Sequence, residues 1–214
     1  MDRGTDRASR TAASHGDSAD DDCTDDSERS TREQLLDAAV ETAIVHGITK
    51  LSVGDVAKRA GLSRQTLYRH FASKDALIAA VVTHETTALI AQVVGAASSI
   101  EDPRDSLEAA FLAALRATRD HPLLDRLIRT EPEALLPLLT TDGGPVITQV
   151  RTVVELLVSV RRPGIDAVAL RRISDVVTRL LISYAVSAPD DPPEVVASYV
   201  ATFLTQNSPM EAPR

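Results

Sequence analysis

Six polar side chains cluster in one short stretch of the sequence, and each of them can donate a hydrogen bond. Arginine can hold guanine, and glutamine can hold adenine, through two hydrogen bonds each in the major groove of DNA. An acidic residue in the same stretch would repel the phosphates, and none is present. The residue types therefore suit the reading of base edges, although a polar face on a short helix is often only solvated. The six residues are Arg64, Gln65, Thr66, Tyr68, Arg69 and His70.

The flanking sequence predicts elements that would present this polar face. Two short helices are expected on either side of a turn at Gly61, which is the helix-turn-helix arrangement, over residues 52–71. Glycine gives the sharp turn the backbone freedom that it needs. Leu67 and Phe71 are one helical turn apart, so they form the inward pair of the second helix and leave the polar side chains outward. The spacing of the two helices, taken alone, favours a DNA-reading unit and a merely solvated helical hairpin equally.

Hydrophobic periodicity predicts helices along most of the chain. A capping box formed by Ser30 and Glu33 predicts the start of the first helix, and Gly47 predicts its end. Ser73 predicts the cap of a long fourth helix. Residues 146–160 are β-branched enough for a buried strand, but their length and helical surroundings favour a helix.

The expected fold is all-α with about nine helices. An N-terminal three-helix helix-turn-helix domain over residues 30–90 is joined by the long fourth helix to a C-terminal helical bundle. The bundle, over residues 91–214, is expected to serve regulation and dimerisation.

The net charge of −8 is distributed unevenly along the chain. Residues 30–84 contain seven basic and five acidic side chains, a net charge of +2, and include all three lysines. Residues 1–29 contain nine acids and four arginines, and residues 85–214 contain seventeen acids and twelve arginines, so each segment carries −5. DNA affinity depends on local positive potential facing the phosphates, so a small positive region on an acidic protein is compatible with DNA binding.

Residues 1–29 contain almost no large apolar side chains and are rich in aspartate, serine, threonine and arginine. Burial cannot offset the entropy of ordering such a segment, so a disordered acidic tail is predicted. The one cysteine, Cys23, cannot form an intramolecular disulfide, which fits a reducing cytoplasm. No apolar run is long enough to span a membrane, and no secretory signal begins the sequence, so a cytoplasmic protein without a membrane partner is expected.

Residues 48–78 resemble the signature of the tetracycline-repressor-type (TetR) family. The most specific part is the run Thr66-Leu67-Tyr68-Arg69-His70-Phe71, followed by Ser73-Lys74 and by Leu77. The rest of the chain agrees with the family only in being helical and of suitable length. The resemblance implies three N-terminal helices, a linking fourth helix, and a bundle that binds a ligand and dimerises.

The resemblance also implies which side chains contact DNA. The third helix would face the bases, Lys74 would contact a phosphate at the start of the fourth helix, and Ser52 would add a phosphate contact at the start of the second. The predicted DNA-binding residues are Ser52, Ser63, Arg64, Gln65, Thr66, Tyr68, His70 and Lys74.

A small effector is expected inside the C-terminal bundle. Its predicted walls are aliphatic, and Phe111 is the one aromatic side chain between residues 85 and 183. An aliphatic or acyl-chain-like molecule suits such walls better than a ring-stacked one. A closed apolar core without a cavity is the alternative. The walls are expected from residues 89–93, 107–118, 123–127 and 146–157, with Gln92, Phe111, Leu115, Thr118, Gln149 and Val153 as candidate contacts.

The last two expected helices, residues 166–186 and 193–206, carry more apolar side chains than one face buries inside a monomer. A protein that reads two half-sites needs two-fold symmetry, so these helices are expected to form a homodimer contact of four helices. The predicted interface residues are Ile173, Val177, Leu180, Leu181, Tyr184, Val196, Tyr199, Val200 and Phe203.

Taken together, these features favour a homodimeric transcriptional repressor that leaves operator DNA when a small apolar effector shifts its conformational population. An activator, or an effector-independent DNA-binding regulator with a closed core, is the alternative. The sequence offers no catalytic frame and no metal-ligand spacing, so no enzyme activity, metal or cofactor is predicted.

Overall fold

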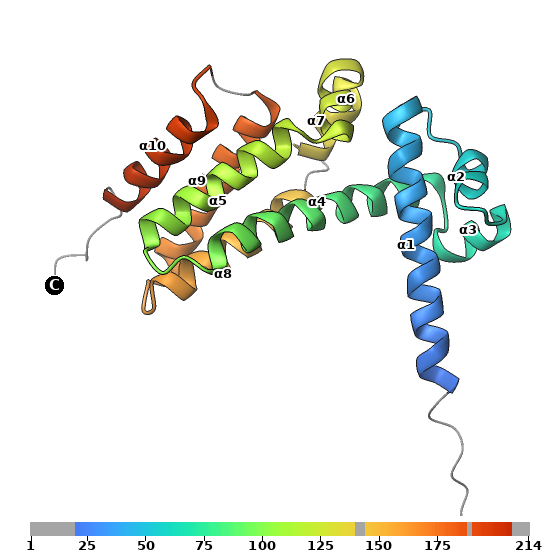
Figure 1. The fold of residues 1–214 in the computed structure, drawn as a ribbon, viewed down its shortest axis with the longest axis horizontal. Coiled ribbons are helices and arrows are strands. Elements are labelled where there is room, and N and C mark those ends of the chain that lie inside the picture. The colour runs from blue at the N-terminus through green and yellow to red at the C-terminus, as the bar shows by residue number, and fades with distance from the viewer. Residues whose placement is uncertain (1–19, 140–143, 188–189, 207–214) are drawn as a thin grey trace, which may run out of the picture.

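The computed structural model describes residues 20–139, 144–187 and 190–206, which form ten α-helices and no strand (Figure 1). The all-α fold is therefore confirmed, and residues 146–160 lie in a helix. The helices are α1 (Asp20–His46), α2 (Val53–Arg59), α3 (Arg64–His70), α4 (Lys74–Ser98), α5 (Pro103–Arg119), α6 (Pro122–Thr130), α7 (Pro132–Leu139), α8 (Gly144–Arg161), α9 (Ala167–Val186) and α10 (Pro193–Gln206).

Ten helices replace the expected nine because the proline-rich stretch after α6 forms a helix of its own. Pro132 occupies the first position of α7, where the missing N–H costs no hydrogen bond. The N–H groups of Ala134 and Leu135 bond to the carbonyl oxygen of Glu131 and close the first turn. The helix then continues through Pro137.

Helix α1 begins at Asp20, before the capping box that was expected at Ser30. The prediction of a disordered tail is therefore wrong for residues 20–29, and residues 1–19 lie outside the described residues. Once the buried part of a helix has formed, each further residue adds a backbone hydrogen bond, and no glycine or proline interrupts residues 20–29. The negative charge of this segment also lies at the helix end that the macrodipole favours.

The first hydrophobic core lies between α1, α2, α3 and the start of α4. Leu35, Leu67 and Leu77 are fully buried in it, and Phe71 is nearly so. The inward pair predicted for α3 is thus confirmed. Burial of these side chains leaves the opposite face of α3 toward solvent.

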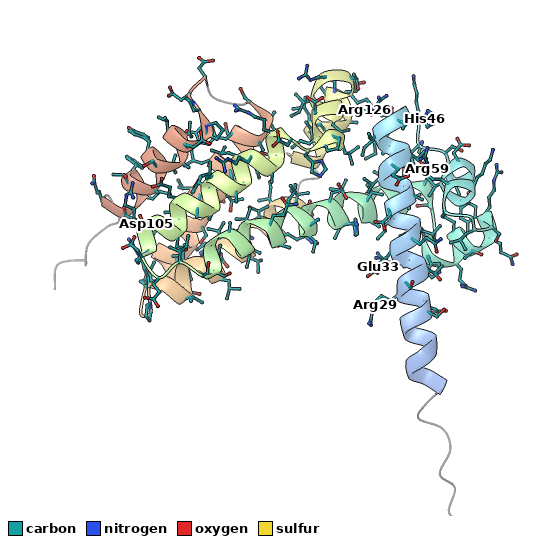
Figure 2. The ribbon with its side chains drawn as sticks, in the orientation of Figure 1. Arg29, Glu33, His46, Arg59, Asp105 and Arg126 are labelled. Atoms are coloured by element: carbon teal, nitrogen blue, oxygen red, sulfur yellow. The ribbon has the colours of Figure 1, made fainter. Side chains whose placement is uncertain are left out.

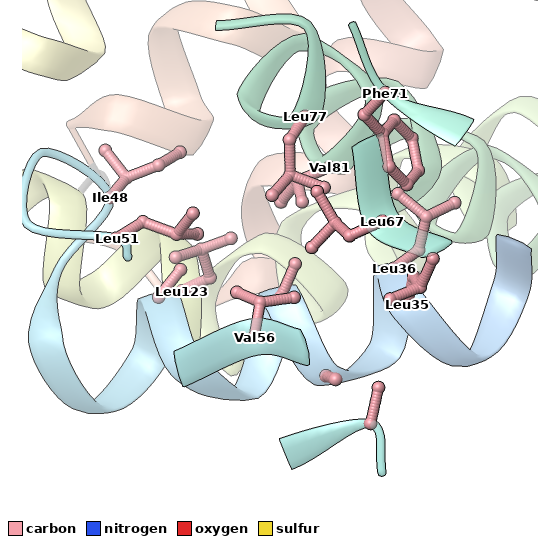
Figure 3. Packing of buried hydrophobic residues seen from close by; sticks show 14 of the residues in the cluster. Leu35, Leu36, Ile48, Leu51, Val56, Leu67, Phe71, Leu77, Val81 and Leu123 are labelled. Carbon is pink, nitrogen blue, oxygen red and sulfur yellow. The ribbon is translucent and has the colours of Figure 1, made fainter. Parts of the chain in front are cut away.

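Helices α6 and α7 complete this core from the other half of the sequence. Leu123 and Leu127 of α6 and Leu135 of α7 belong to the same buried cluster. Figure 3 shows Leu123 close to Leu51 and Val56. The boundary expected near residue 91 therefore does not separate two independent cores.

The long helix α4 connects the helix-turn-helix unit to the bundle (Figure 1). Its first turns are buried in the first core through Leu77 and Val81, and the helix also packs against α5 and α8. By length and composition alone α4 would be apolar enough to cross a membrane, and it is the one such helix in the described part of the chain. In this fold Leu77, Val81 and Ala97 of α4 are buried.

A second core joins α5, α8, α9 and α10. Phe111 of α5 lies at its centre and is 1% exposed, with Val154 of α8 and Val177 of α9 packed in the same cluster. Helix α10 packs mainly on α5, whereas α9 packs mainly on α8. The bundle therefore has its own core beside the one that supports the helix-turn-helix.

Candidate DNA-reading face and effector cavity

The turn between α2 and α3 has the geometry that the helix-turn-helix requires. Gly61 has a φ of +67°, in the left-handed region that favours glycine, and the N–H of Leu62 bonds to Ala57 at 2.9 Å. The side chain of Ser52 caps α2, and that of Ser63 caps α3 by accepting from the N–H of Thr66 at 3.0 Å. These local bonds fix the direction in which α3 leaves the turn.

The outward face of α3 carries hydrogen-bonding side chains and no carboxylate. Arg64, Gln65 and Arg69 are exposed, and Tyr68 is 53% exposed. Thr66 is half-buried, and its hydroxyl shares a hydrogen bond of 2.8 Å with Ser63 at the start of the helix. Most of the predicted reading residues therefore share one accessible face.

Arg64 lies against α2 at Gly54. A Cβ at Gly54 would lie closer than 3.0 Å to the guanidinium of Arg64, which is the flexible end of an exposed side chain. Sequence reasoning did not anticipate this contact.

His70 differs from the other predicted reading residues. It is half-buried at the end of α3, and its Nε2 atom is buried without a hydrogen-bond partner among the described residues. This nitrogen is covered by the protein in the present conformation, so it does not face DNA.

Two charged side chains hold Thr49, in the loop between α1 and α2. The ammonium group of Lys74 donates to the carbonyl oxygen of Thr49 at 2.7 Å. From the opposite half of the sequence, the carboxylate of Glu131 accepts from the N–H of Ile48 at 2.8 Å, from the N–H of Thr49 at 3.3 Å, and from the Thr49 hydroxyl. The residue that follows α6 is thus bonded directly to the loop that leads into α2.

Gly47 allows this close approach. Its φ of +92° lies in the left-handed region, and a side chain there would collide with the carboxylate of Glu131. The glycine expected to end α1 therefore has a second role, which depends on a residue far away in the sequence.

Glu131 is 7% exposed, and its environment lowers the pKa of the carboxyl group. Burial by itself raises this pKa, but the hydrogen bonds from the Thr49 side chain and from the N–H groups of Ile48 and Thr49 outweigh it. The attraction of Arg126 acts in the same direction as the hydrogen bonds. The contact is therefore strongest with the carboxylate ionised.

A cavity of about 230 Å³ lies between α4, α5, α6, α8 and α9. Its walls are almost entirely aliphatic, and Phe111 is the one phenyl ring among the described residues that line it. Of the candidate contacts, Phe111, Thr118 and Val153 line the cavity. All four sequence segments expected as walls contribute to it.

Three candidate contacts lie elsewhere. Gln92 is exposed on α4, and Leu115 is 6% exposed in the second core. Gln149 is half-buried, with a buried carbonyl oxygen that has no partner among the described residues, and it does not line the cavity. Helical periodicity predicts which helices form the walls, but the rotation of each helix decides which residues face inward.

A polar pair interrupts the aliphatic wall and was not anticipated from the sequence. Nε2 of His121 lies 2.9 Å from Oε2 of Glu85, and their side chains are 14% and 19% exposed. His121 also caps α6, because its Nδ1 accepts from the N–H of Leu124 at 3.3 Å. His121 therefore both caps α6 and lines the cavity.

Helix α6 has side chains in both functional regions. Leu123 and Leu127 line the cavity and belong to the core that supports α3. The same helix is capped by His121, which lines the cavity, and ends next to Glu131, which holds the loop before α2. One short rigid element therefore touches both the cavity and the DNA-reading unit.

Comparison with known proteins agrees with this arrangement in both halves of the chain. The family model described as "Bacterial regulatory proteins, tetR family" matches residues 35–81, and the model described as "Bacterial Tetracyclin repressor, C-terminal domain" matches residues 102–206. The chain belongs to the TetR family. Its helix-turn-helix lies in the first matched segment, and most of the cavity wall lies in the second.

Individual TetR relatives match to different extents. An uncharacterized HTH-type regulator of Mycobacterium tuberculosis matches over 46% of its own length, so the matched region spans about half of such relatives. The M. tuberculosis transcriptional regulator AlkX is 28% identical over 182 residues, which cover 81% of this chain and 83% of AlkX. FasR of Mycolicibacterium smegmatis, named a transcriptional activator, is 38% identical over 82 residues, or 38% of this chain and 37% of FasR.

A solved TetR structure extends the likeness to the whole fold. The TetR family repressor AlkX from Dietzia sp. strain DQ12-45-1b, which is implicated in biodegradation of n-alkanes, has a TM-score of 0.67. It is 27% identical, and the match covers 81% of this chain and 94% of that chain.

The residues predicted for a dimer contact of this TetR chain divide into two groups. Val177, Val196 and Val200 are buried in the second core of the same chain, so they are removed from the predicted interface. They were chosen because apolar periodicity does not distinguish a face that packs inside one chain from a face that packs between two. Ile173, Leu180, Leu181 and Tyr184 are half-buried, whereas Tyr199 and Phe203 are exposed by 72% and 51%.

Proposed function

We propose that this chain is a cytoplasmic transcriptional repressor that binds operator DNA and releases it when a small apolar effector occupies the cavity. The observation that carries the DNA-binding part is the outward face of α3, where Arg64, Gln65 and Tyr68 are accessible and no carboxylate is present. Arginine and glutamine offer the paired hydrogen bonds that discriminate guanine and adenine.

The phosphate contacts proposed for Ser52 and Lys74 are compatible with their positions. Both lie at helix N-termini beside the reading helix, where backbone N–H groups and the helix dipole favour an anion. Lys74 uses one hydrogen bond on Thr49, and an ammonium group has three donors, so two remain for a phosphate.

The effector part rests on the connection through α6. A ligand changes DNA affinity only if it binds one arrangement of the reading heads better than the other. Leu123 and Leu127 place α6 in the cavity wall and in the core beneath α3, so a ligand that displaces α6 would also displace that core. The bond between Glu131 and the loop at Thr49 supports the same route.

An aliphatic effector is favoured by the composition of the cavity wall. Aliphatic side chains offer apolar contact without a ring for stacking, and the ring of Phe111 is buried in the second core. The similarity to a repressor implicated in n-alkane biodegradation points to the same chemical class.

A homodimer is the proposed working state. The exposed side chains Val195, Tyr199 and Phe203 are spaced by four residues along α10 and so form one apolar stripe, while Val176 is exposed on α9. A second pair, Leu156 and Val160, is exposed on α8. Pairing of such stripes between two copies would bury them and would place two copies of α3 for two half-sites.

An activator is the second candidate, because FasR is named an activator, whereas the solved relative from Dietzia is named a repressor. Both candidates share the reading helix. Repression and activation differ in where the operator lies relative to the promoter, which transcription from a reporter would distinguish.

The decisive experiment is selection of bound duplexes from a random DNA library with the full chain, followed by titration of the selected sequence. We expect a two-fold symmetric site and affinity that falls steeply with salt. An aliphatic ligand added to the complex should release the DNA. Equal affinity for selected and random duplexes would overturn sequence-specific DNA binding.

A further inference from the structure

The polar side chains of the cavity determine which head group an aliphatic effector can carry. Among the described residues that line the cavity, these are Glu85, Thr86, Thr118 and His121. A polar group of a ligand buried here must find a partner, because an unpaired buried polar group costs binding free energy. The question is therefore whether these four residues offer donors or acceptors.

The two threonine hydroxyls have already used their protons. Thr86 donates to the carbonyl oxygen of Val82 at 2.7 Å, and Thr118 donates to that of Ala114 at 2.8 Å. A hydroxyl has one proton, so each threonine can offer a ligand only its oxygen lone pairs. Both side chains therefore act as acceptors.

The one donor of the His121 ring lies beside Glu85. Nδ1 of His121 accepts from the N–H of Leu124, so this nitrogen carries no proton. The ring proton is then on Nε2, which lies 2.9 Å from the carboxylate of Glu85. A ligand that needs a donor would have to separate this pair and disturb the cap of α6.

Glu85 supplies the charge and the remaining acceptor. Its Oε2 faces His121, and its Oε1 has no hydrogen bond in the described part of the chain. An ionised carboxylate accepts only, and its hydrogen bonds to a charged donor are roughly twice as strong as neutral ones. Apart from Nε2 of His121, which lies beside Glu85, the polar side chains of the cavity therefore offer only acceptors, and Glu85 adds negative charge.

We propose that the effector is an aliphatic molecule with a hydrogen-bond-donating head, and that a protonated amine is the head bound best. The proposal rests on the function proposed above and specifies its ligand. A hydroxyl head can donate to Glu85 or to either threonine and is bound more weakly. A carboxylate head has no proton to donate, meets the charge of Glu85, and is excluded.

The test compares ligands that share one chain and differ in the head: n-decylamine, n-decanol, n-decanoate and n-decane. Binding to the full chain is measured by thermal shift and by isothermal calorimetry, and release of the selected operator is measured by fluorescence anisotropy. We expect n-decylamine to bind about tenfold or more tightly than n-decanoate, the ratio that one charged hydrogen bond supplies. n-Decanol should fall between them.

Glu85→Gln isolates the charge, because glutamine keeps an acceptor oxygen and the same size. In this variant the preference for n-decylamine over n-decanol should disappear. The affinity for n-decanol should stay within about twofold of that of the unmodified chain, because the hydrogen bond of an uncharged donor loses little free energy when its acceptor becomes neutral. Glu108→Gln is the matched control, since it removes the same charge from α5 outside the cavity. Its selectivity should equal that of the unmodified chain.

Two results would overturn the proposal. One is binding of n-decanoate as tight as that of n-decylamine, and the other is unchanged selectivity in Glu85→Gln. Release of the operator by n-decanoate or n-decane alone would refute the head-group assignment and leave the proposed function standing. Failure of all four ligands to bind would refute both the head group and the aliphatic effector.

Discussion

At the scale of single residues, two opposite charges hold the loop between α1 and α2, and one of them comes from the second half of the chain. Glu131 accepts from the N–H groups of Ile48 and Thr49, and Lys74 donates to the carbonyl oxygen of Thr49. Gly47 leaves the space that the carboxylate occupies. The loop before α2 therefore depends on residues from two other elements.

Glu131→Gln tests this contact through its dependence on pH. The substitution keeps the shape and removes the charge, so it should lower the free energy of unfolding by about 1 to 3 kcal/mol at neutral pH. The folded state lowers the carboxyl pKa below its ordinary value of 4.5, so the stabilisation is present above pH 4.5 and is lost as the pH falls through the lowered pKa. Thermal unfolding should thus show a difference from the unmodified chain that shrinks in acid.

The exposed Glu133→Gln is the control for that measurement, because it removes the same charge from a nearby surface position. It should leave the melting temperature almost unchanged at every pH. A difference between Glu131→Gln and the unmodified chain that persists in acid would mean that packing, and not the ionised carboxylate, stabilises the loop.

Arg64→Ala and Gln65→Ala test base reading. Both side chains are exposed on the acid-free face of α3, so each substitution should cost roughly 1–3 kcal/mol at particular base positions and relax specificity there. Affinity for a panel of single-base variants of the selected operator provides the measurement. Uniform weakening across the panel would assign these side chains to the DNA backbone.

Lys74→Ala tests the proposed phosphate contact. It should weaken binding to all duplexes alike and reduce the slope of affinity against salt by about one unit per site. Arg129→Ala, an exposed cation on α6, serves as the control for loss of positive charge. An unchanged salt slope would indicate that Lys74 acts only on the carbonyl oxygen of Thr49.

At the scale of helices, the short helix α6 belongs both to the first core and to the cavity wall. Its buried face contributes Leu123 and Leu127 to the core beneath α3 and to the wall of the cavity. The imidazole of His121 caps its first turn and contacts Glu85. Because the same side chains of α6 contact both regions, this helix can couple the cavity to the DNA-reading unit directly.

Leu127→Ala tests the structural part of that role. Leu127 is 5% exposed, and removal of a buried leucine side chain should lower the free energy of unfolding by about 2–5 kcal/mol. Arg129→Ala on the exposed side of the same helix should change it by no more than about 0.5 kcal/mol. Chemical denaturation followed by circular dichroism measures both. Equal effects of the two substitutions would show that α6 is not part of the core.

Helix α2 is held to α1 by an ion pair and a hydrogen bond. Arg59 pairs with Glu41 at 2.9 Å, and Figure 2 shows Arg59 beside α1. The side-chain amide of Gln34 donates to the carbonyl oxygen of Ala60 at 2.9 Å. The exposed ion pair adds little stability, whereas the bond to Ala60 satisfies a carbonyl at the end of α2.

At the scale of the whole molecule, an apolar stripe on α10 stays exposed in a single copy. Tyr199→Glu places a charge in its middle and should convert a dimer to a monomer in light scattering, with the helical content retained, because a buried unpaired charge is costly. Operator affinity should fall as well, since a monomer holds one half-site. Arg129→Glu is the control for an added carboxylate, and a dimer that persists in Tyr199→Glu would place the interface elsewhere, as on α8.

The sequence by itself determined the elements whose signals lie within one or two helical turns. Gly61 predicts the sharp turn, Ser73 predicts the start of α4, and the spacing of Leu67 and Phe71 predicts the outward face of α3. Each of these depends on hydrogen bonds or contacts between residues that are neighbours along the chain. The predicted segments of the cavity wall have the same origin, because apolar periodicity identifies a buried face before its partner is known.

Only the tertiary structure decided how those faces pair. Glu131 meets Thr49, and Glu85 meets His121, across separations for which the local sequence holds no signal. The apolar face of α10 divides into a buried Val196 and an exposed Tyr199 because α5 covers one side of the helix and not the other. Such contacts depend on the rotation and position of whole helices, which the combined packing of all helices sets and no single stretch of sequence specifies.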